Sequence, residues 1–310
     1  MMTRRLVILG TLVSALVLVA IPAGADELSD YLDETDQATY SGRRLIGTTW
    51  DGLERMGVVE VEQLGGMAMV SSGHTYVMVG DGKVHAIGSP HAALAFVLDA
   101  SAPVSHGYQV AMGETATHLG RSAAVVEVTE DGMLRMRMVI DEDTSAPLAT
   151  EVFDDEGNLF RYSTMIEFSA SAPSMHDYED VGEYRTMVPL DGAVVPETVG
   201  PYGLVDVYGG PADGEQAFYS DGLFTFSLFA IEGSTNIDDV VTDGRAWSSG
   251  GFEYVRVIAP AEVWVLWNAS GSTYALVGDL PPDHLEEVLV DLPRPAQRNW
   301  FGRVWDKLFG

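Results

Sequence analysis

The chain has 310 residues, with 17 Lys and Arg against 46 Asp and Glu, which gives a formal net charge of −29 at pH 7. This length allows about two domains, and so negative a charge argues strongly against nucleic-acid binding, which needs a basic surface. The absence of cysteine excludes disulfides, thiolate metal ligands, cysteine nucleophiles and a lipid anchor on an N-terminal cysteine. With 46% apolar residues and 33 glycines, we expect a globular, strand-rich and turn-rich protein.

Residues 1–25 have the layout of a secretory signal peptide. Arg4 and Arg5 precede an apolar run over residues 6–21, and the small residues 23–25 offer a cleavage site. A retained membrane anchor is the alternative, because the run is only slightly shorter than the roughly 20 residues that span a bilayer. We favour cleavage, and therefore expect an exported protein that acts in the periplasm or another extracytoplasmic compartment.

Residues 26–189 are expected to form a first domain built on an antiparallel meander. Gly, Asp and Ser pairs separate short β-rich runs, and Asp131-Gly132 is a strong hairpin signal. Helices are expected over residues 28–38 and 91–98. The expected strands are residues 58–62, 67–71, 74–79, 83–87, 123–129, 133–141, 148–153 and 159–168.

Alternation along two of these strands predicts one apolar and one wet face. Arg135, Arg137, Arg161 and Glu167 fall on the wet side. If helices cover the apolar side incompletely, it lines a pocket for a lipid or acyl ligand; the alternative is a dry core with methionine as filler. The pocket candidates are Leu134, Met136, Met138, Ile140, Phe160, Tyr162 and Ile166.

Residues 190–293 are expected to form a smaller antiparallel β domain closed by one helix. Asp283 is the predicted N-cap of that helix, after Pro281 and Pro282. The expected strands are residues 216–219, 223–231, 252–258, 262–267 and 273–277. The predicted fold class is therefore α+β and strand-dominated, with a curved antiparallel sheet under covering helices and a second β domain.

Residues 294–310 form a basic amphipathic tail. The aromatic residues Trp300, Phe301 and Trp305 recur at three- and four-residue spacing, opposite Arg298 and Arg303. This pattern suits contact with a membrane surface, and equally suits packing on the chain's own acidic body.

The sequence carries no recognisable catalytic or metal-binding motif. No G-x-S-x-G segment is present, and the run from His284 to Glu287 lacks the second histidine of H-E-x-x-H. The acidic clusters read as solvated turns. We therefore predict a protein that is not an enzyme and has no metal or cofactor; a secreted hydrolase with a hidden carboxylate pair is left as a third class.

Short motifs in both halves resemble the MucB/RseB family of sigma-E regulatory proteins. In the second half these are residues 265–267, residues 277–282 and the motif Tyr219, Ser220, Asp221, Gly222 and Leu223. In the first half they are residues 40–42, 119–123 and 148–168. The resemblance implies a first domain similar to lipoprotein carriers of the LolA and LppX type, a half-barrel with helices on its concave side.

The resemblance also implies a function. Members of this family bind the extracytoplasmic part of a membrane anti-sigma factor and release it when they meet a lipid signal. We therefore expect a stress-response regulator whose second domain, with the motif at residues 219–223, docks the partner. The alternative is a lipid or lipoprotein carrier with the same fold.

Overall fold

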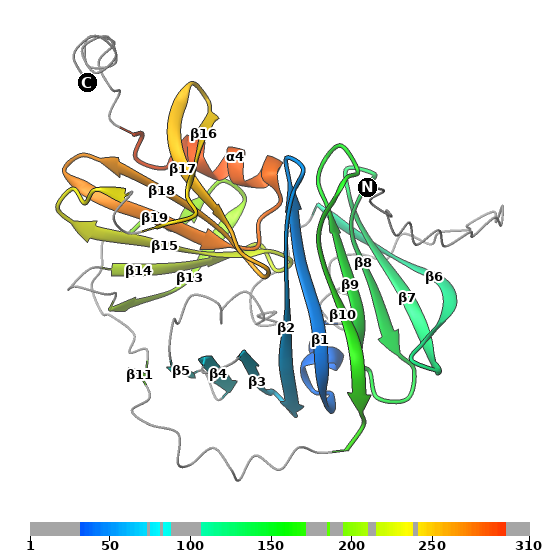
Figure 1. Ribbon diagram of the computed structural model, residues 1–310. Helices are drawn as coiled ribbons and strands as arrows, with labels where there is room; N and C mark the ends of the chain where they lie inside the picture. Colours follow the sequence, from blue (N-terminus) through cyan, green and yellow to red (C-terminus); the bar gives the residue numbers. More distant parts are fainter. Residues whose placement is uncertain are drawn as a thin grey trace, which may run out of the picture.

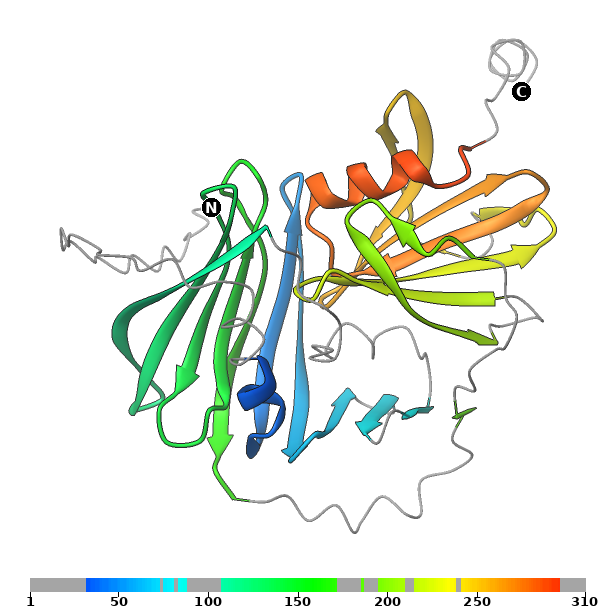
Figure 2. The ribbon, with the colours of Figure 1, turned by 180° about the vertical axis from the view of Figure 1, so that it is seen from behind.

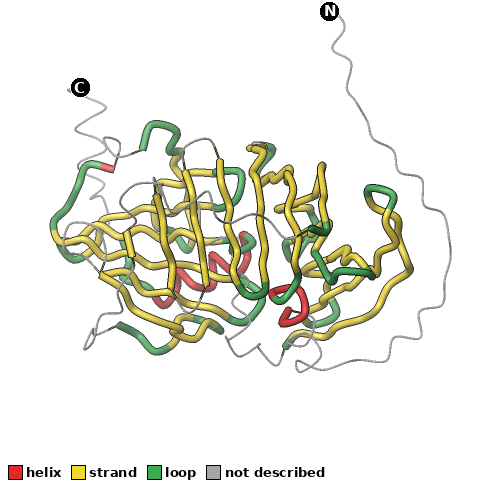
Figure 3. Tube along the Cα trace, turned by 90° about the horizontal axis from the view of Figure 1, so that it is seen from below, coloured by secondary structure: helices red, strands yellow, loops and turns green. Residues whose placement is uncertain are grey.

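Two antiparallel sheets make up most of the computed structural model (Figure 1), which describes residues 32–72, 75–80, 83–87, 107–171, 185–186, 195–209, 215–237 and 241–295. Besides strands, these residues form a short helix over 32–36 and the helix α4 (Pro282–Asp291). Figure 3 shows the two sheets side by side along the molecule. The strand-dominated architecture predicted from the sequence is confirmed at this level.

The first sheet has eleven strands in the order β11-β5-β4-β3-β2-β1-β10-β9-β8-β7-β6. Apart from the pairing of β1 with β10 and of β11 with β5, neighbours in the sheet are neighbours in the chain, as in a meander. The strands are β1 (Thr39–Trp50), β2 (Leu53–Leu64), β3 (Met67–Ser72), β4 (Thr75–Gly80), β5 (Lys83–Ile87), β6 (Tyr108–His118), β7 (Arg121–Glu130), β8 (Met133–Asp141), β9 (Pro147–Phe153), β10 (Leu159–Ser169) and β11 (Arg185–Thr186).

The second sheet has eight strands in the order β12-β13-β14-β15-β19-β18-β17-β16. In Figures 1 and 2 it lies beside β1 and β2, with α4 running across it. Its strands are β12 (Thr198–Val199), β13 (Tyr202–Gly209), β14 (Glu215–Ser220), β15 (Thr225–Glu232), β16 (Arg245–Ser249), β17 (Phe252–Ile258), β18 (Val263–Ala269) and β19 (Ser272–Gly278).

The hairpin signals locate turns well. Asp131 and Gly132 both adopt positive φ, at 50° and 79°, and join β7 to β8 as a two-residue turn requires. The strands predicted from the sequence include none of β1, β6, β13 and β16, because glycines and polar residues break their apolar alternation. The predicted signal peptide, the helix over 91–98 and the tail over 296–310 lie outside the described residues.

A single apolar core joins the two sheets. One cluster of buried side chains contains Tyr108, Met136 and Phe160 from the first sheet together with Tyr219 and Trp267 from the second. Leu285, Val288 and Leu289 of α4 belong to the same cluster. Since burial of apolar area is the main favourable term in folding, the two sheets stabilise each other directly.

A β-bulge in β8 overturns one prediction. The register with β7 shifts between Val128 and Thr129, so that Arg135 has no residue opposite it. The extra residue breaks the two-residue alternation, and both Arg135 and Met136 become buried. The prediction that Arg135 is on the wet face is therefore wrong, whereas Arg137 does face outward and pairs with carboxylates of the neighbouring strands.

Two similar irregularities occur in β10. The register with β9 shifts between Leu159 and Arg161, which places Arg161 opposite buried Val152 and not on the wet face as predicted. The register with β1 shifts so that Ile166 is the extra residue, and its side chain is 40% exposed while Met165 is buried. A strict period of two therefore misassigns both ends of this strand.

The helix α4 begins two residues earlier than predicted. Pro281 occupies the N-cap position without a side-chain cap, and Asp283 lies in the first turn. Asp283 is not the N-cap because its carboxylate pairs with Arg135 of the first sheet. Within the described part of the chain, no helix is long and apolar enough to cross a membrane.

We predict that Gly278→Ala destabilises the protein by about 1–3 kcal/mol, because overpacking of a tight site costs this much. A Cβ at this position in β19 would lie 2.5 Å from the Thr225 carbonyl oxygen and 2.6 Å from the Phe226 Cβ. Urea unfolding measures the change. The control is Gly203→Ala in β13, where the nearest atom is 3.9 Å away, and an equal loss in both variants would contradict the packing argument.

Candidate functional site

Buried polar contacts connect the two sheets where the ends of β1, β6, β7, β8 and β10 meet the second sheet and α4; we call this region the junction. Figure 2 shows these strand ends facing the first turn of α4 and the loops around it. Its contacts join residues more than 100 positions apart in the chain, so folding of both halves is needed to form it.

The turn between β14 and β15 supplies the first contact. The Tyr108 hydroxyl on β6 donates a 2.6 Å hydrogen bond to Asp221, whose other oxygen accepts the backbone N–H groups of Leu223 and Phe224. Burial raises the pKa of Asp221, and these hydrogen bonds counteract the rise. Burial also raises the pKa of Tyr108, which keeps its hydroxyl protonated as the donor.

A histidine on α4 supplies the second contact. Burial raises the pKa of Tyr202 well above its usual value, and its hydroxyl forms a 2.6 Å hydrogen bond with Nδ1 of His284. Nε2 of His284 donates to Glu130 of β7 at 2.9 Å, because an ionised carboxylate can only accept. This hydrogen bond is the main cause that lowers the pKa of Glu130 to about 2, and Arg135 adds to it.

Arg135 is the centre of the third contact. Its side chain is 4% exposed and pairs with Glu130 at 2.8 Å and with Asp283 of α4. A carboxylate of the first sheet and one of α4 therefore share one buried cation, which offsets the desolvation cost of all three groups.

The β1–β2 turn supplies the fourth contact. Arg256 of β17 pairs with Asp51 at 2.8 Å and lies over the Trp50 ring at 3.9 Å. Trp50 in turn packs edge-on against Trp247 of β16. These aromatic and cation–π contacts close one end of the junction.

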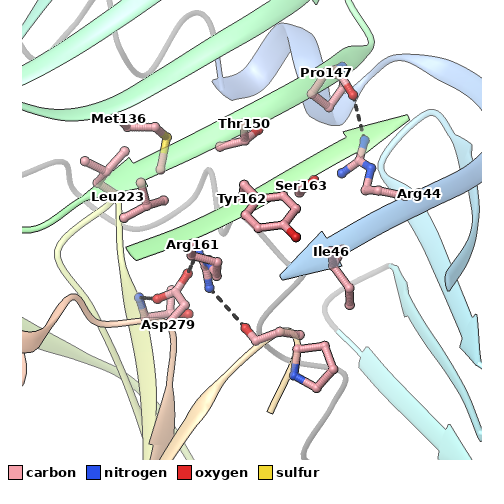
Figure 4. A pocket seen from close by; sticks show the side chains of 14 residues that line it. Arg44, Ile46, Met136, Pro147, Thr150, Arg161, Tyr162, Ser163, Leu223 and Asp279 are labelled. Carbon is pink, nitrogen blue, oxygen red and sulfur yellow. Dashed lines mark hydrogen bonds and ion pairs between the residues drawn. The ribbon is translucent and has the colours of Figure 1, made fainter. Parts of the chain in front are cut away.

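A cavity of ≈ 80 Å³ lies inside the junction (Figure 4). Arg161 reaches across it and donates to Asp279 at 2.9 Å and to the Ala261 carbonyl at 3.2 Å. Arg44 lies at the other side and donates to the Pro147 carbonyl at 2.6 Å. The walls are Arg44, Ile46, Met136, Pro147, Thr150, Val152, Arg161, Tyr162, Ser163, Leu223, Thr225, Pro260, Ala261 and Asp279.

Glu262 lies in the loop whose residues Pro260 and Ala261 line this cavity. Burial raises its pKa to about 8, while a hydrogen bond from the Trp264 indole and the charge of Arg161 act the other way. The indole Nε1 donates to Oε1 at 2.6 Å, and Oε2 is buried without a hydrogen-bond partner. Its carboxyl group is thus mostly neutral at pH 7.

A scan against protein-family models finds no match, and a search of curated proteins finds none. Among solved structures, the crystal structure of MucB superposes with a TM-score of 0.58 at 18% identity, covering 86% of this chain and 96% of that one. The complex structure of Pseudomonas aeruginosa MucA/MucB gives 0.51 at 18% identity, covering 88% and 99%. MucB in complex with MucA(peri) gives 0.52 at 18% identity with the same coverage.

The fold is MucB/RseB-like. At this level of identity the likeness concerns the fold, and it extends over both sheets because nearly the whole MucB chain is covered. The recognition made from short motifs is confirmed in this sense. The finer expectation of a LolA-type half-barrel in the first half stays a prediction.

The structure distributes the predicted lipid-pocket residues among three environments. Met136, Met138, Ile140 and Phe160 are buried in the shared core, and of these only Met136 also lines the cavity. The Tyr162 hydroxyl donates to Glu54 at 3.3 Å. Leu134 is half-buried, and Ile166 is exposed.

The predicted partner motif lies inside the junction. Tyr219, Ser220, Asp221 and Leu223 are all at most 3% exposed, and Gly222 has a φ of 90° that an L side chain rarely adopts. These residues shape the turn that receives Tyr108. Their contact with a partner stays a prediction, as does the role of the tail residues beyond Pro295.

Sequence reasoning missed Arg44, Ser163 and Glu262, and it included Asp279 only as part of the motif at residues 277–282. Nothing distinguishes the first three in a single sequence, because their importance comes from strand pairing and from the second sheet. Among the described residues, no group of three or more His, Asp or Glu could hold a metal ion.

We predict that Arg135→Gln destabilises the protein by about 3–5 kcal/mol, since it removes the buried cation that two partly buried carboxylates share. The control is Arg43→Gln, whose pair with Glu167 is about half exposed and is worth less than about 1 kcal/mol. Chemical denaturation compares the two. Similar losses would show that the junction pair is no stronger than a surface pair.

We predict that stability falls as pH rises from 5 to 8, because Glu262 binds its proton more tightly in the folded than in the unfolded chain. Glu262 changes the free energy of unfolding by at most roughly 1.4 kcal/mol per pH unit, and its contribution to the slope ends above its pKa in the folded protein. Glu262→Gln keeps an oxygen that accepts the hydrogen bond from the Trp264 indole, and it should make stability less dependent on pH. Glu286→Gln, on the exposed face of α4, should leave the pH dependence unchanged; an unaltered slope in Glu262→Gln would refute the assignment.

Proposed function

We propose that this protein is an extracytoplasmic regulator that binds the outer part of a membrane anti-sigma factor and catalyses no reaction. The observation that supports this most is the likeness to MucB, which has been solved in complex with MucA(peri). The likeness covers 99% of that MucB chain, so both sheets of the partner-binding protein have counterparts here. The N-terminal signal layout agrees with export.

The junction favours a regulator over the alternative, a lipid or lipoprotein carrier. A carrier needs a volume that holds acyl chains, and the junction cavity, at ≈ 80 Å³ among the described residues, is smaller than an apolar cavity of about 150 Å³ that binds one benzene. A second sheet fixed by buried charges also has no evident use in a carrier.

Lipid sensing forms the second part of the proposal. Met136 and Phe160 belong to one core cluster with Tyr219 and Trp267 of the second sheet. An acyl chain that enters between Met136 and Phe160 would therefore displace residues that support the second sheet. Because packed cores respond to such insertion by discrete rearrangement, this shared core is a physical route from lipid to partner release.

The test is purification of the tagged full-length chain from membranes of its own host, followed by native mass spectrometry. A wash at about 0.5 M salt removes proteins held only by the surface charge of the chain. The expected result is a stoichiometric single-span membrane protein. An exported protein of similar negative charge, purified in the same way, controls for capture by charge.

Two outcomes contradict the proposal. Bound lipid without any protein partner would move the carrier to first place. The same co-purifying proteins on the control protein would show that charge alone captures them.

A further inference from the structure

Arg44 differs from the other arginines that line the junction. Arg135, Arg161 and Arg256 each pair with at least one carboxylate. Arg44 donates from Nε to the Met165 sulfur at 3.3 Å and from Nη2 to the Pro147 carbonyl, and it has no carboxylate partner among the residues that the structure describes. An arginine in a cavity wall, without a counter-ion in a protein of net charge −29, is unexpected on composition alone.

A second polar group in the same wall also lacks a partner. The Ser163 hydroxyl is buried and makes no hydrogen bond within the described structure. Ser163 is opposite Ile46 in the β1–β10 pair, and Arg44 is two residues from Ile46, so all three share one face of the sheet. A buried hydroxyl without a partner is costly, which makes it a candidate ligand contact.

The charges around the cavity favour an anion. The wall contains two cations, Arg44 and Arg161, against one carboxylate, Asp279, which is already bonded to Arg161 and to the Thr225 N–H. The neighbouring Glu262 adds little negative charge at neutral pH. The cavity is therefore a locally positive site within an acidic molecule.

We propose that this cavity binds a carboxylate or phosphate group, held by the Arg44 guanidinium and the Ser163 hydroxyl. Nε and one N–H of Nη2 bind Met165 and Pro147, so the Nη1 group and the other N–H of Nη2 are the donors that match two oxygens of such a group. The volume of ≈ 80 Å³ admits a group of this size, but it is too small to enclose an acyl chain. This inference does not depend on the proposed function.

The experiment is calorimetric titration of the full chain with acetate, inorganic phosphate and dodecanoate below its micelle concentration. Arg44→Gln should weaken binding at least tenfold. Arg43→Gln is the matched control, because Arg43 is the adjacent residue, lies on the opposite face and pairs with exposed Glu167; it should leave the affinity unchanged. Arg44→Lys keeps the positive charge but removes the planar guanidinium. This variant replaces Arg44→Gln if Arg44→Gln does not fold.

Ser163→Ala separates a ligand contact from a structural one. The hydroxyl has no partner in the described structure, so its removal should weaken anion binding several-fold without lowering the melting temperature. Arg44-dependent binding of all three probes at similar affinity would support a site for a free small anion. Much tighter Arg44-dependent binding of dodecanoate would support a site for a lipid headgroup.

The proposal is overturned if none of the probes binds, or if binding is equal in the unaltered protein, in Arg44→Gln and in Arg43→Gln. In either case ordered water would be the only occupant of the cavity.

Discussion

The ion pair of Arg135 with Glu130 of the first sheet and Asp283 of α4 is the interaction on which the rest of the structure depends. Glu130 precedes the β7–β8 turn and Asp283 begins α4, so one buried cation fixes the helix of the second half against the strand ends of the first. His284, in the same turn of α4, binds Glu130 as well.

Short sequence patterns predict the hairpins of the first sheet, but they do not predict the buried contacts of the junction. The Asp131-Gly132 turn and the alternation in β8 predict the hairpins correctly, because turn chemistry and period are properties of short segments. The bulges at Arg135, Phe160 and Ile166 depend on the register with neighbouring strands, which no short segment specifies. Two arginines that read as surface residues are therefore central to the junction.

The two halves of the chain share one cluster of buried apolar side chains, so each half contributes to the stability of the other. Met136, Met138 and Phe160, which the sequence suggests for a lipid pocket, belong to the same buried cluster as residues of the second sheet. Of the predicted pocket residues, Met136 and Tyr162 line the junction cavity.

The most direct test of the account is a double-mutant cycle between Tyr108 and Asp221, which join the two sheets through one buried hydrogen bond. Tyr108→Phe, Asp221→Asn and the double variant would be compared by urea unfolding. The account predicts a coupling free energy above about 1 kcal/mol, as expected for residues in contact. A coupling near zero would show that the two sheets do not rely on the junction and would contradict the account.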